Sequence, residues 1–246
     1  MTEETMTGPE KAGERDYPVE GFTEVRVSNA LEFEITQGKD YSVKATGRDK
    51  LLESLKVDVS GQTLKLSLDS GTHSWLGLGW KHLSGGDVKV AISMPELRKL
   101  AVSGAARGTA RGFKSDRDFE MELSGASKAD IDIEAGRTTI AISGAGRVSG
   151  ELKAQETAVA MSGASRCELA GTATNIDLDS SGASHADLSR LQVKDADVSI
   201  SGAGKARINM NGTLNVRLSG ASSLACEGEV VVGQRKITGA SSMTRG

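Results

Sequence analysis

The sequence predicts an all-β protein: a single-stranded, parallel β-helix, right-handed, with coils of about 19 residues and an irregular β cap at its N-terminal end. Three observations predict this fold. The tripeptide Ser-Gly-Ala recurs at a nearly constant spacing, apolar side chains alternate with polar ones on both sides of it, and the 246 residues include 30 glycines but only three prolines. Many tight turns between short alternating strands are typical of stacked β-coils.

The tripeptide marks one position in every repeat. The steps between successive marks are 21, 19, 19, 19, 20, 18 and 19 residues. A period that stays near 19 with a small drift is typical of a solenoid, in which each unit buries its apolar face against its neighbours. The marks begin at Ser103, Ser124, Ser143, Ser162, Ser181, Ser201, Ser219 and, as Thr-Gly-Ala, at Thr238.

The residues around each mark alternate with a period of two. Side chains one and three places before the serine are mostly apolar, as are those five and seven places after it, which places both sets on inward faces of strands. We therefore expect the tripeptide to be the corner of a coil, with the glycine in a conformation that a Cβ forbids and the alanine packed inside the corner. The serines would form a ladder of hydroxyls rather than a row of nucleophiles, because His185 is the only histidine in this half of the chain.

The first ninety or so residues repeat the pattern more loosely. Segments 25–35, 57–68 and 88–100 look like the same strand and corner, and their serines Ser28, Ser60 and Ser93 are 32 and 33 residues apart. Asn29 stands where glycine usually stands, and asparagine tolerates the same left-handed turn. The longer spacings predict insertions or antiparallel hairpins that cap an otherwise bare sheet edge. We accordingly divide the chain into a flexible tail (1–17), a cap with the first coils (18–94) and a regular β-helix (95–246).

The segment from "FTEVRVSNALEFEITQGKDY" through "VKVAISMPELRKLAVSGAARG" and the Ser-Gly-Ala coils resembles the putative auto-transporter adhesin head GIN domain family, long called a domain of unknown function. The resemblance covers roughly Phe22 to the end of the chain. It implies a bacterial β-helix that is secreted or anchored to the envelope, with adhesion as its proposed role. It implies no catalytic residues.

Composition argues against several classes of function. The net charge of −3, with both signs mixed throughout, gives no reason to expect nucleic acid as a partner. Cys167 and Cys226 form no C-x-x-C motif and lie in inward positions three coils apart, so we expect small core side chains and neither a disulfide nor a zinc site. No aspartate follows the glycines at the spacing of calcium-binding repeats, and we expect no metal or cofactor.

The sequence contains no run of about 18 apolar residues, so it predicts no transmembrane helix. The N-terminal residues "MTEETMTGPEKAGERDY" have no apolar core of the signal-peptide kind, which fits either a cytoplasmic protein or a mature form whose leader is absent. With the resemblance, we expect an extracytoplasmic protein: periplasmic, surface-anchored or secreted.

The loop at 71–87 interrupts the pattern. It is rich in glycine and holds both tryptophans and two of the three histidines: His73, Trp75, Trp80 and His82. The tryptophans either fold over the cap and close the core, or form an exposed patch for self-association or for docking a surface protein or glycan, since aromatic residues anchor interfaces. A metal site at the two histidines is disfavoured because no cysteine or clustered carboxylate completes it.

A second surface feature is a stripe four residues after each serine. Stacked coils would place these side chains about 5 Å apart on the outward face. The stripe is either a solvated face compensated by Asp130, Glu168 and Asp187, or a track for a polyanion. It consists of Arg107, Lys128, Arg147, Arg166, His185 and Lys205.

The sequence therefore predicts a non-catalytic structural or adhesive protein. The alternative is a module that binds a polyanion or glycan through the basic stripe. A polysaccharide-active enzyme is the third possibility, disfavoured because the outward acids are scattered and the coils lack aromatic residues for stacking on sugars.

Overall fold

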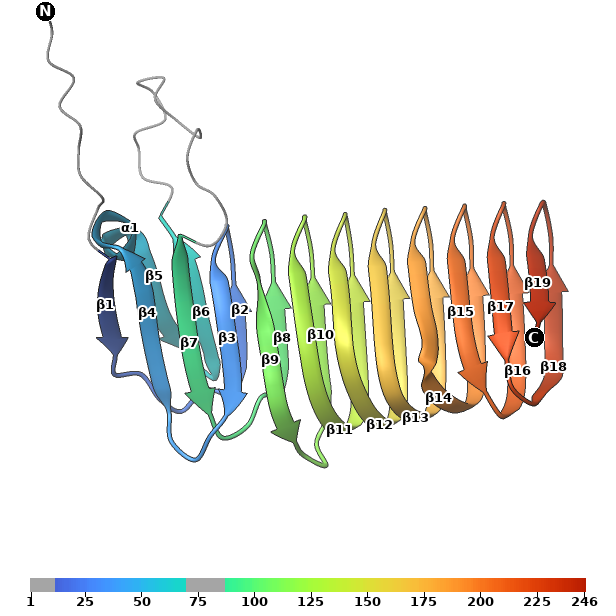
Figure 1. Cartoon of the computed structure of the whole chain (residues 1–246), viewed down its shortest axis with the longest axis horizontal. Helices are drawn as coiled ribbons and strands as arrows, with labels where there is room; N and C mark the ends of the chain where they lie inside the picture. Colours follow the sequence, from blue (N-terminus) through green and yellow to red (C-terminus); the bar gives the residue numbers. More distant parts are fainter. Residues whose placement is uncertain (1–11, 70–86) are drawn as a thin grey trace, which may run out of the picture.

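The structure is a computed structural model that describes residues 12–69 and 87–246. It is a β-solenoid of about eight turns spaced about 19 residues apart, with 69% of residues in strands and 3% in helix, which confirms the predicted fold class. The coils stack along one long axis, with the irregular N-terminal part at one end and the C-terminus at the other (Figure 1).

Each regular coil crosses two facing sheets, joined by a Ser-Gly-Ala turn at one edge and a second bend at the other. The long strands belong to both sheets: the first part of β11 pairs with β9 and its last part with β10. All pairings in this region are parallel. The strands are β8 (Lys99–Val102), β9 (Arg107–Lys114), β10 (Phe119–Leu123), β11 (Lys128–Ile142), β12 (Arg147–Met161), β13 (Arg166–Ser180), β14 (His185–Ile200), β15 (Lys205–Met210), β16 (Gly212–Leu218), β17 (Ser223–Glu227), β18 (Val230–Ile237) and β19 (Ser242–Arg245).

The N-terminal part contains the first coil and a cap. Strands β2 and β3 form that coil, pairing in parallel with β8 and β9 on one side and with β6 and β7 on the other. The cap adds antiparallel pairs, β1 with β4, β4 with β7 and β5 with β6, as expected for hairpins at this end. Its elements are β1 (Ala12–Tyr17), β2 (Glu24–Val27), β3 (Glu32–Gln37), β4 (Ser42–Arg48), α1 (Asp49–Ser54), β5 (Leu55–Ser60), β6 (Thr63–Leu68) and β7 (Val88–Met94).

Two of the three expected N-terminal corners are turns. Asn29 has φ 71° and is the only non-glycine residue with positive φ in the described chain, which confirms its glycine-like role. Gly61, after Ser60, has φ 62° and turns the β5–β6 hairpin. Ser93 differs: it lies inside β7 and its hydroxyl donates to the Asp40 carbonyl. The proline at position 95 then ends the strand, so the corner predicted at Ser93 is wrong.

The last part of the expected flexible tail, residues 1–17, is a strand. Ala12–Tyr17 form β1, which pairs with β4 from Ala12 opposite Arg48 to Tyr17 opposite Val43. The prediction considered only apolar side chains, which are scarce here. The backbone of β4 supplies hydrogen-bonding groups along an otherwise open edge, and a polar strand can satisfy them. Residues 1–11 lie outside the described chain.

The interior is aliphatic and thin. The inward positions predicted on both sides of the turn are buried along most of the coils, and no aromatic residue occurs after Phe119. Cys167 and Cys226 are free thiols, 0% and 1% exposed, in agreement with their predicted core role. Burial raises the pKa of the Cys167 thiol to about 12 and that of Cys226 to about 11, so neither is a ready nucleophile.

The turn itself corrects one expectation. The alanine of the tripeptide points into solvent in every coil instead of packing inside the corner. The following residue fills the corner and is therefore small; Ser127, Ser165 and Ser184 are 0%, 2% and 2% exposed. The sequence signal for this corner is the position after the tripeptide, which is always Ala, Ser or Gly.

The glycine of each turn is required by two constraints. The eight turn glycines have φ between 72° and 82°, the left-handed region. They also stack directly on one another: a Cβ on Gly144 would lie 2.8 Å from the Gly125 carbonyl oxygen, and one on Gly163 2.6 Å from that of Gly144. The Gly125 carbonyl accepts a 2.8 Å hydrogen bond from the Ala145 N–H, so the parallel ladder continues through the turn.

Bulges absorb the drift in the repeat length. The 21-residue step coincides with a register shift between β9 and β11, and the 20-residue step with a shift between β13 and β14. In the second case the Asp187 carboxylate accepts from both the N–H and the hydroxyl of Ser189. The shifts lie after the turn, so extra residues do not disturb the glycine stack.

The two ends of the solenoid are protected differently. At the N-terminal end, α1 buries Leu52 and the antiparallel strands cover the core. At the C-terminal end, the outer strand β18 has a register shift against β16 and carries the cations Arg235 and Lys236. Bulges and charged side chains discourage the pairing of further strands. Val231, 66% exposed, is the only large exposed hydrophobic residue in the described chain.

We predict that Gly144→Val will destabilise the protein by roughly 1–3 kcal/mol, because the new side chain must adopt a left-handed φ against the Gly125 carbonyl. The matched control is Ala145→Val, one residue later, where the side chain points into solvent and φ is not positive. Urea denaturation of both variants measures the difference. Equal free energies of unfolding would show that the stacked turn does not limit stability.

Candidate functional site

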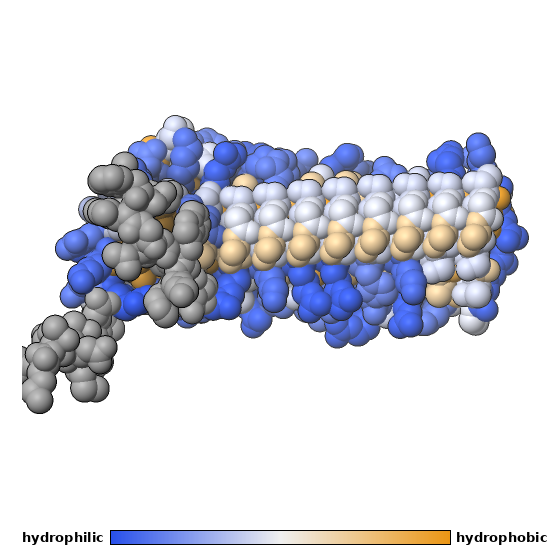
Figure 2. Space-filling view, turned by 90° about the horizontal axis from the view of Figure 1, so that it is seen from above, coloured by the Kyte–Doolittle hydropathy of each residue, from blue (hydrophilic) through white to orange (hydrophobic). Residues whose placement is uncertain are grey.

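The Ser-Gly-Ala turns form a straight ridge along one edge of the solenoid. Figure 2 shows this ridge from above as two weakly polar rows with a weakly apolar row along one side of them, and with hydrophilic side chains on both flanks. No charged residue occurs in any tripeptide of the ridge. The two flanks are the outer faces of the two sheets, and they differ in chemistry.

On one flank the structure brings all six predicted basic residues into one column. Each is the first residue of its strand, and successive members are register partners, for example Arg107 with Lys128 and Lys128 with Arg147. The positions before and after each of them face inward, which directs the six side chains outward. We call Arg107, Lys128, Arg147, Arg166, His185 and Lys205 the basic column. The next two coils carry Ser223 and Ser242 at this position.

The predicted compensating acids neutralise only part of the column. Glu168 lies 3.6 Å from Arg166. Asp130 instead pairs with Arg111 at 2.6 Å and accepts from the Ser149 hydroxyl at 3.0 Å. Asp187 is bound by Ser189 within the bulge. A further acid that the sequence analysis did not consider, Glu32, lies 3.8 Å from Arg107.

Three members of the column therefore keep their charge uncompensated by an ion pair. Lys128, Arg147 and Lys205 have no carboxylate within 4.0 Å among the described residues. Their side chains are exposed, so each can still meet a ligand. The column is thus a surface with surplus positive charge on a chain whose net charge is negative.

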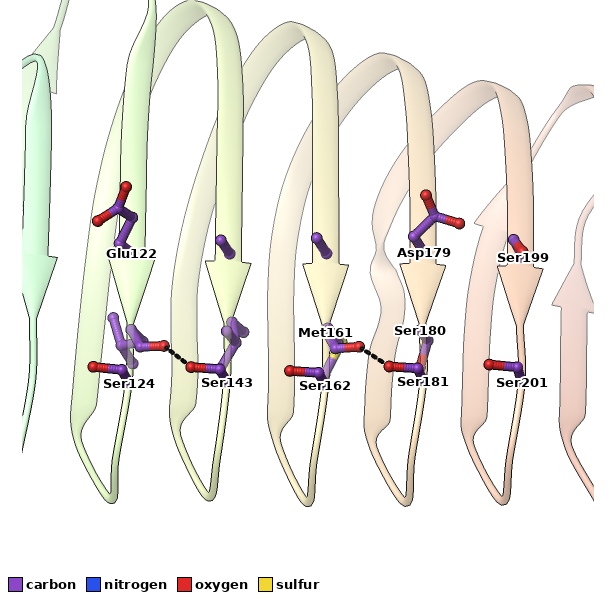
Figure 3. Close-up of a pocket in the computed structure, with 14 residues that line it drawn as sticks. Glu122, Ser124, Ser143, Met161, Ser162, Asp179, Ser180, Ser181, Ser199 and Ser201 are labelled. Carbon is purple, nitrogen blue, oxygen red and sulfur yellow. Dashed lines mark hydrogen bonds between the residues drawn. The ribbon is translucent and has the colours of Figure 1, made fainter.

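The other flank carries a shallow groove of about 570 Å³ that crosses β10 to β14. One wall is the serine row of the ridge, and Figure 3 shows these hydroxyls in line from coil to coil. The other wall has Glu122 and Asp179 with the small residues Ala141 and Ala160 between them. The Ser143 hydroxyl donates to the Leu123 carbonyl at 3.3 Å, so a hydrogen bond to the backbone holds this serine side chain in its wall. This groove was not predicted from the sequence. The signal for it is the pair of alanines two places before Ser143 and Ser162, which leave room on the outer face.

The groove offers no arrangement typical of hydrolases. His185, the one histidine among the described residues, begins β14 on the opposite flank, so no imidazole of the described chain lies beside the serine row. Glu122 and Asp179 are three strands apart, about 14 Å, whereas glycosidase carboxylates are at most about 9.5 Å apart. Glu122 is also bound by Lys99 at 2.8 Å, which lowers its pKa.

At the edge of the groove, β13 and β14 carry three neighbouring aspartates on this outer face. Asp177 of β13 and Asp197 of β14 are register partners, and Asp179, which also lines the groove, lies two residues after Asp177 on β13. Burial, and then repulsion from Asp179 and Asp197, raises the pKa of Asp177. No group of three or more histidine, cysteine or acidic side chains in the described chain could hold a metal ion.

The other predicted site residues are His73, Trp75, Trp80 and His82, and they lie outside the described residues. Of the loop 71–87, only Asp87 is described, and it pairs with Arg48. In the parts of the chain that the structure covers, no helix has the length and apolar character needed to cross a bilayer.

Comparison with known proteins identifies the family. The model of the family described as "Putative auto-transporter adhesin, head GIN domain" matches residues 21–229. The chain belongs to this family. No curated protein matches the GIN domain sequence.

Solved structures share the GIN domain fold at low sequence identity. A "putative lipid binding protein" from Parabacteroides distasonis has a TM-score of 0.83 and is 17% identical, over 95% of this chain and 96% of the other. A "putative adhesin" from the same species has a TM-score of 0.79 and 19% identity, over 97% and 98% of the two chains. One from Bacteroides fragilis has a TM-score of 0.71 and 19% identity, over 96% and 98%. These likenesses concern the fold.

Two aspartates of the GIN domain should respond oppositely to pH. The raised pKa of Asp177 means that its charge opposes folding at neutral pH, so Asp177→Asn should stabilise the protein at pH 7 by a few tenths of a kcal/mol, on the order of an exposed ion pair. The gain should vanish as the pH falls below about 4, where aspartate is protonated in both states.

Asp187 is the matched comparison, because hydrogen bonds from Ser189 lower its pKa. Its charge stabilises the fold above the pKa of the unfolded state, and this contribution is lost as the pH falls through the lower, folded-state value. Asp187→Asn should therefore destabilise the protein at pH 7. Denaturation curves at pH 7 and at about pH 2.5, below the ordinary pKa of aspartate, measure both variants. Shifts of the same sign at pH 7 would contradict the assignment.

Proposed function

We propose that this GIN domain protein is a non-catalytic adhesive protein of the bacterial envelope or exterior, which holds an anionic polysaccharide along its basic column. The observation that carries the proposal is the alignment of six basic side chains in register, three of which lack an acidic partner among the described residues. The repeat sets the spacing of these charges at about 4.8 Å, the separation of neighbouring strands. A regular row of cations is suited to a regular row of anions.

The shape of the column favours an extended polymer over a membrane surface. The column is one residue wide. It is bordered on one side by the uncharged alanines of the ridge and on the other by Asp130, Glu168 and Asp187, two residues further along their strands; only beside Lys205 does that border position hold a cation, Arg207. A broad anionic bilayer would meet these carboxylates and be repelled by them, whereas a single chain can follow the cations between the two borders.

The chemistry of the serine row and of the groove supports a non-catalytic role. The serine row has no histidine beside it, and the two carboxylates of the groove are too far apart for the known glycosidase geometries. Solved relatives of the same fold are named adhesins or a lipid-binding protein, which agrees with a binding role and with a location at the cell surface.

Retention on a sulfated polysaccharide tests the proposal. We expect the full chain to bind immobilised heparin, used as a probe, with an affinity that falls as salt rises. Lys128→Ala/Lys205→Ala should weaken binding by about 2 kcal/mol, roughly thirtyfold, because each cation near an anionic surface contributes about 1 kcal/mol. It should also flatten the dependence on salt.

The matched control is Lys194→Ala/Arg235→Ala, which removes the same charge from exposed positions outside the column. This variant should keep most of the affinity. Equal losses in the two double variants would show that net charge, and not the column, governs binding. Tighter binding to vesicles containing phosphatidylglycerol than to heparin would show that the ligand of the column is a membrane surface and not a polysaccharide.

A further inference from the structure

The first three residues of the basic column differ from the rest because they line a hollow. Arg107, Lys128 and Arg147 line a cavity of about 270 Å³ on the outer face of β9, β11 and β12. Two places after Arg107 and Arg147 the strands carry the short, uncharged Thr109 and Ser149, with Asp130 at the same position on β11 between them. On β13 and β14 the same position holds the carboxylates of Glu168 and Asp187.

The acids at the rim of this hollow are already engaged. Glu32 is paired with Arg107 at 3.8 Å. Asp130 is paired with Arg111 at 2.6 Å and also accepts the Ser149 hydroxyl. The three cations that line the hollow, together with Arg111 beside it, outnumber the two carboxylates by two positive charges. This surplus resides on Lys128 and Arg147, which have no acidic partner in the described chain.

The donors that remain suit a group with several acceptor oxygens. The Lys128 ammonium has three N–H donors and the Arg147 guanidinium presents a planar fork of donors. The Thr109 hydroxyl has no hydrogen-bond partner among the described residues and lines the same hollow. The Ser149 hydroxyl has committed its proton to Asp130, so it leaves Thr109 as the free hydroxyl donor.

We propose that this hollow binds a phosphate or sulfate ester group, a tetrahedral oxyanion, of the polysaccharide that lies along the basic column. The inference rests on the proposed function and names the anchoring group of its ligand. The three terminal oxygens of such an ester can accept from the lysine, the arginine and the threonine at once. A phosphate monoester, with a charge of about −1.5 to −2, offsets nearly the whole surplus, and a sulfate ester offsets half of it. A carboxylate has only two oxygens to accept from the three donors, so it matches the hollow less well.

Titration of the full chain with small anions at constant ionic strength tests the inference. Backbone amide shifts measured by NMR should show saturable binding of inorganic phosphate and of sulfate at Thr109, Lys128 and Arg147. Acetate should bind at least fivefold more weakly. Lys128→Ala and Arg147→Ala should each weaken phosphate binding about tenfold, the typical effect of losing a charge-assisted hydrogen bond.

Three further variants separate a built site from diffuse attraction. Thr109→Val keeps size and charge but removes the hydroxyl, and it should weaken phosphate binding about fivefold. Arg147→Lys keeps the charge but loses the planar fork, and it should weaken binding severalfold. Lys205→Ala removes a column charge outside the hollow, and phosphate binding should not change.

The outcomes distinguish this inference from the proposed function. If Lys205→Ala weakens phosphate binding as much as Lys128→Ala, or if acetate binds as well as phosphate, the hollow is not an oxyanion site. If Lys128→Ala/Lys205→Ala also reduces heparin retention in that case, the proposed function stands without the hollow. If phosphate binds the hollow as expected but no column variant affects heparin retention, the proposed function fails and only the small-anion site remains.

Discussion

The hydrogen bond from the alanine N–H of one turn to the glycine carbonyl of the turn before it sets the geometry of the whole solenoid. It brings successive turns so close that a Cβ on the glycine would lie 2.4–2.9 Å from the carbonyl of its neighbour. With this contact repeated in every coil, the strands on both sides of the turn are fixed in parallel register. The interior can then be thin and aliphatic, because register does not depend on large interlocking side chains.

This constraint also converts sequence position into surface chemistry. A residue four places after a serine always begins a strand and always points outward, so six separated basic residues become one column. The same rule places serines in a row on the ridge and small residues over the groove on the other flank. The column and the groove lie on opposite sides of the ridge, which separates the surplus of positive charge from the three aspartates of β13 and β14.

The sequence alone predicts the regular part of the fold because its constraints are local. The glycine, the alternation of apolar residues and the basic column each depend on a fixed offset from the serine, and Asn29 shows that the backbone conformation matters more than the residue type. Longer-range effects were missed. The strand β1 depends on the open edge of β4, and the burial of the corner residue Ser165 depends on the turn that exposes the alanine before it.

The hollow at Lys128 and Arg147 illustrates a second limit. Its existence depends on which carboxylates are engaged elsewhere, and the pairing of Asp130 with Arg111 links residues 19 positions apart whose side chains could have paired otherwise. Charge counts along a sequence cannot assign such partners. The distances between side chains assign these partners. They show that the surplus positive charge in this hollow lies on Lys128 and Arg147.

The register between β11 and β12 has no shift, and each paired residue lies opposite the one 19 positions later, so a single coil is a segment of sequence that could be gained or lost as a whole. Duplicating such a segment in the gene adds one coil whose upper and lower surfaces match those already present. Deleting one closes the stack without leaving a mismatched edge. The length of the rod, and with it the number of contacts offered to a long ligand, can therefore change in single steps through genetic recombination, while the cap and the last coil stay as they are.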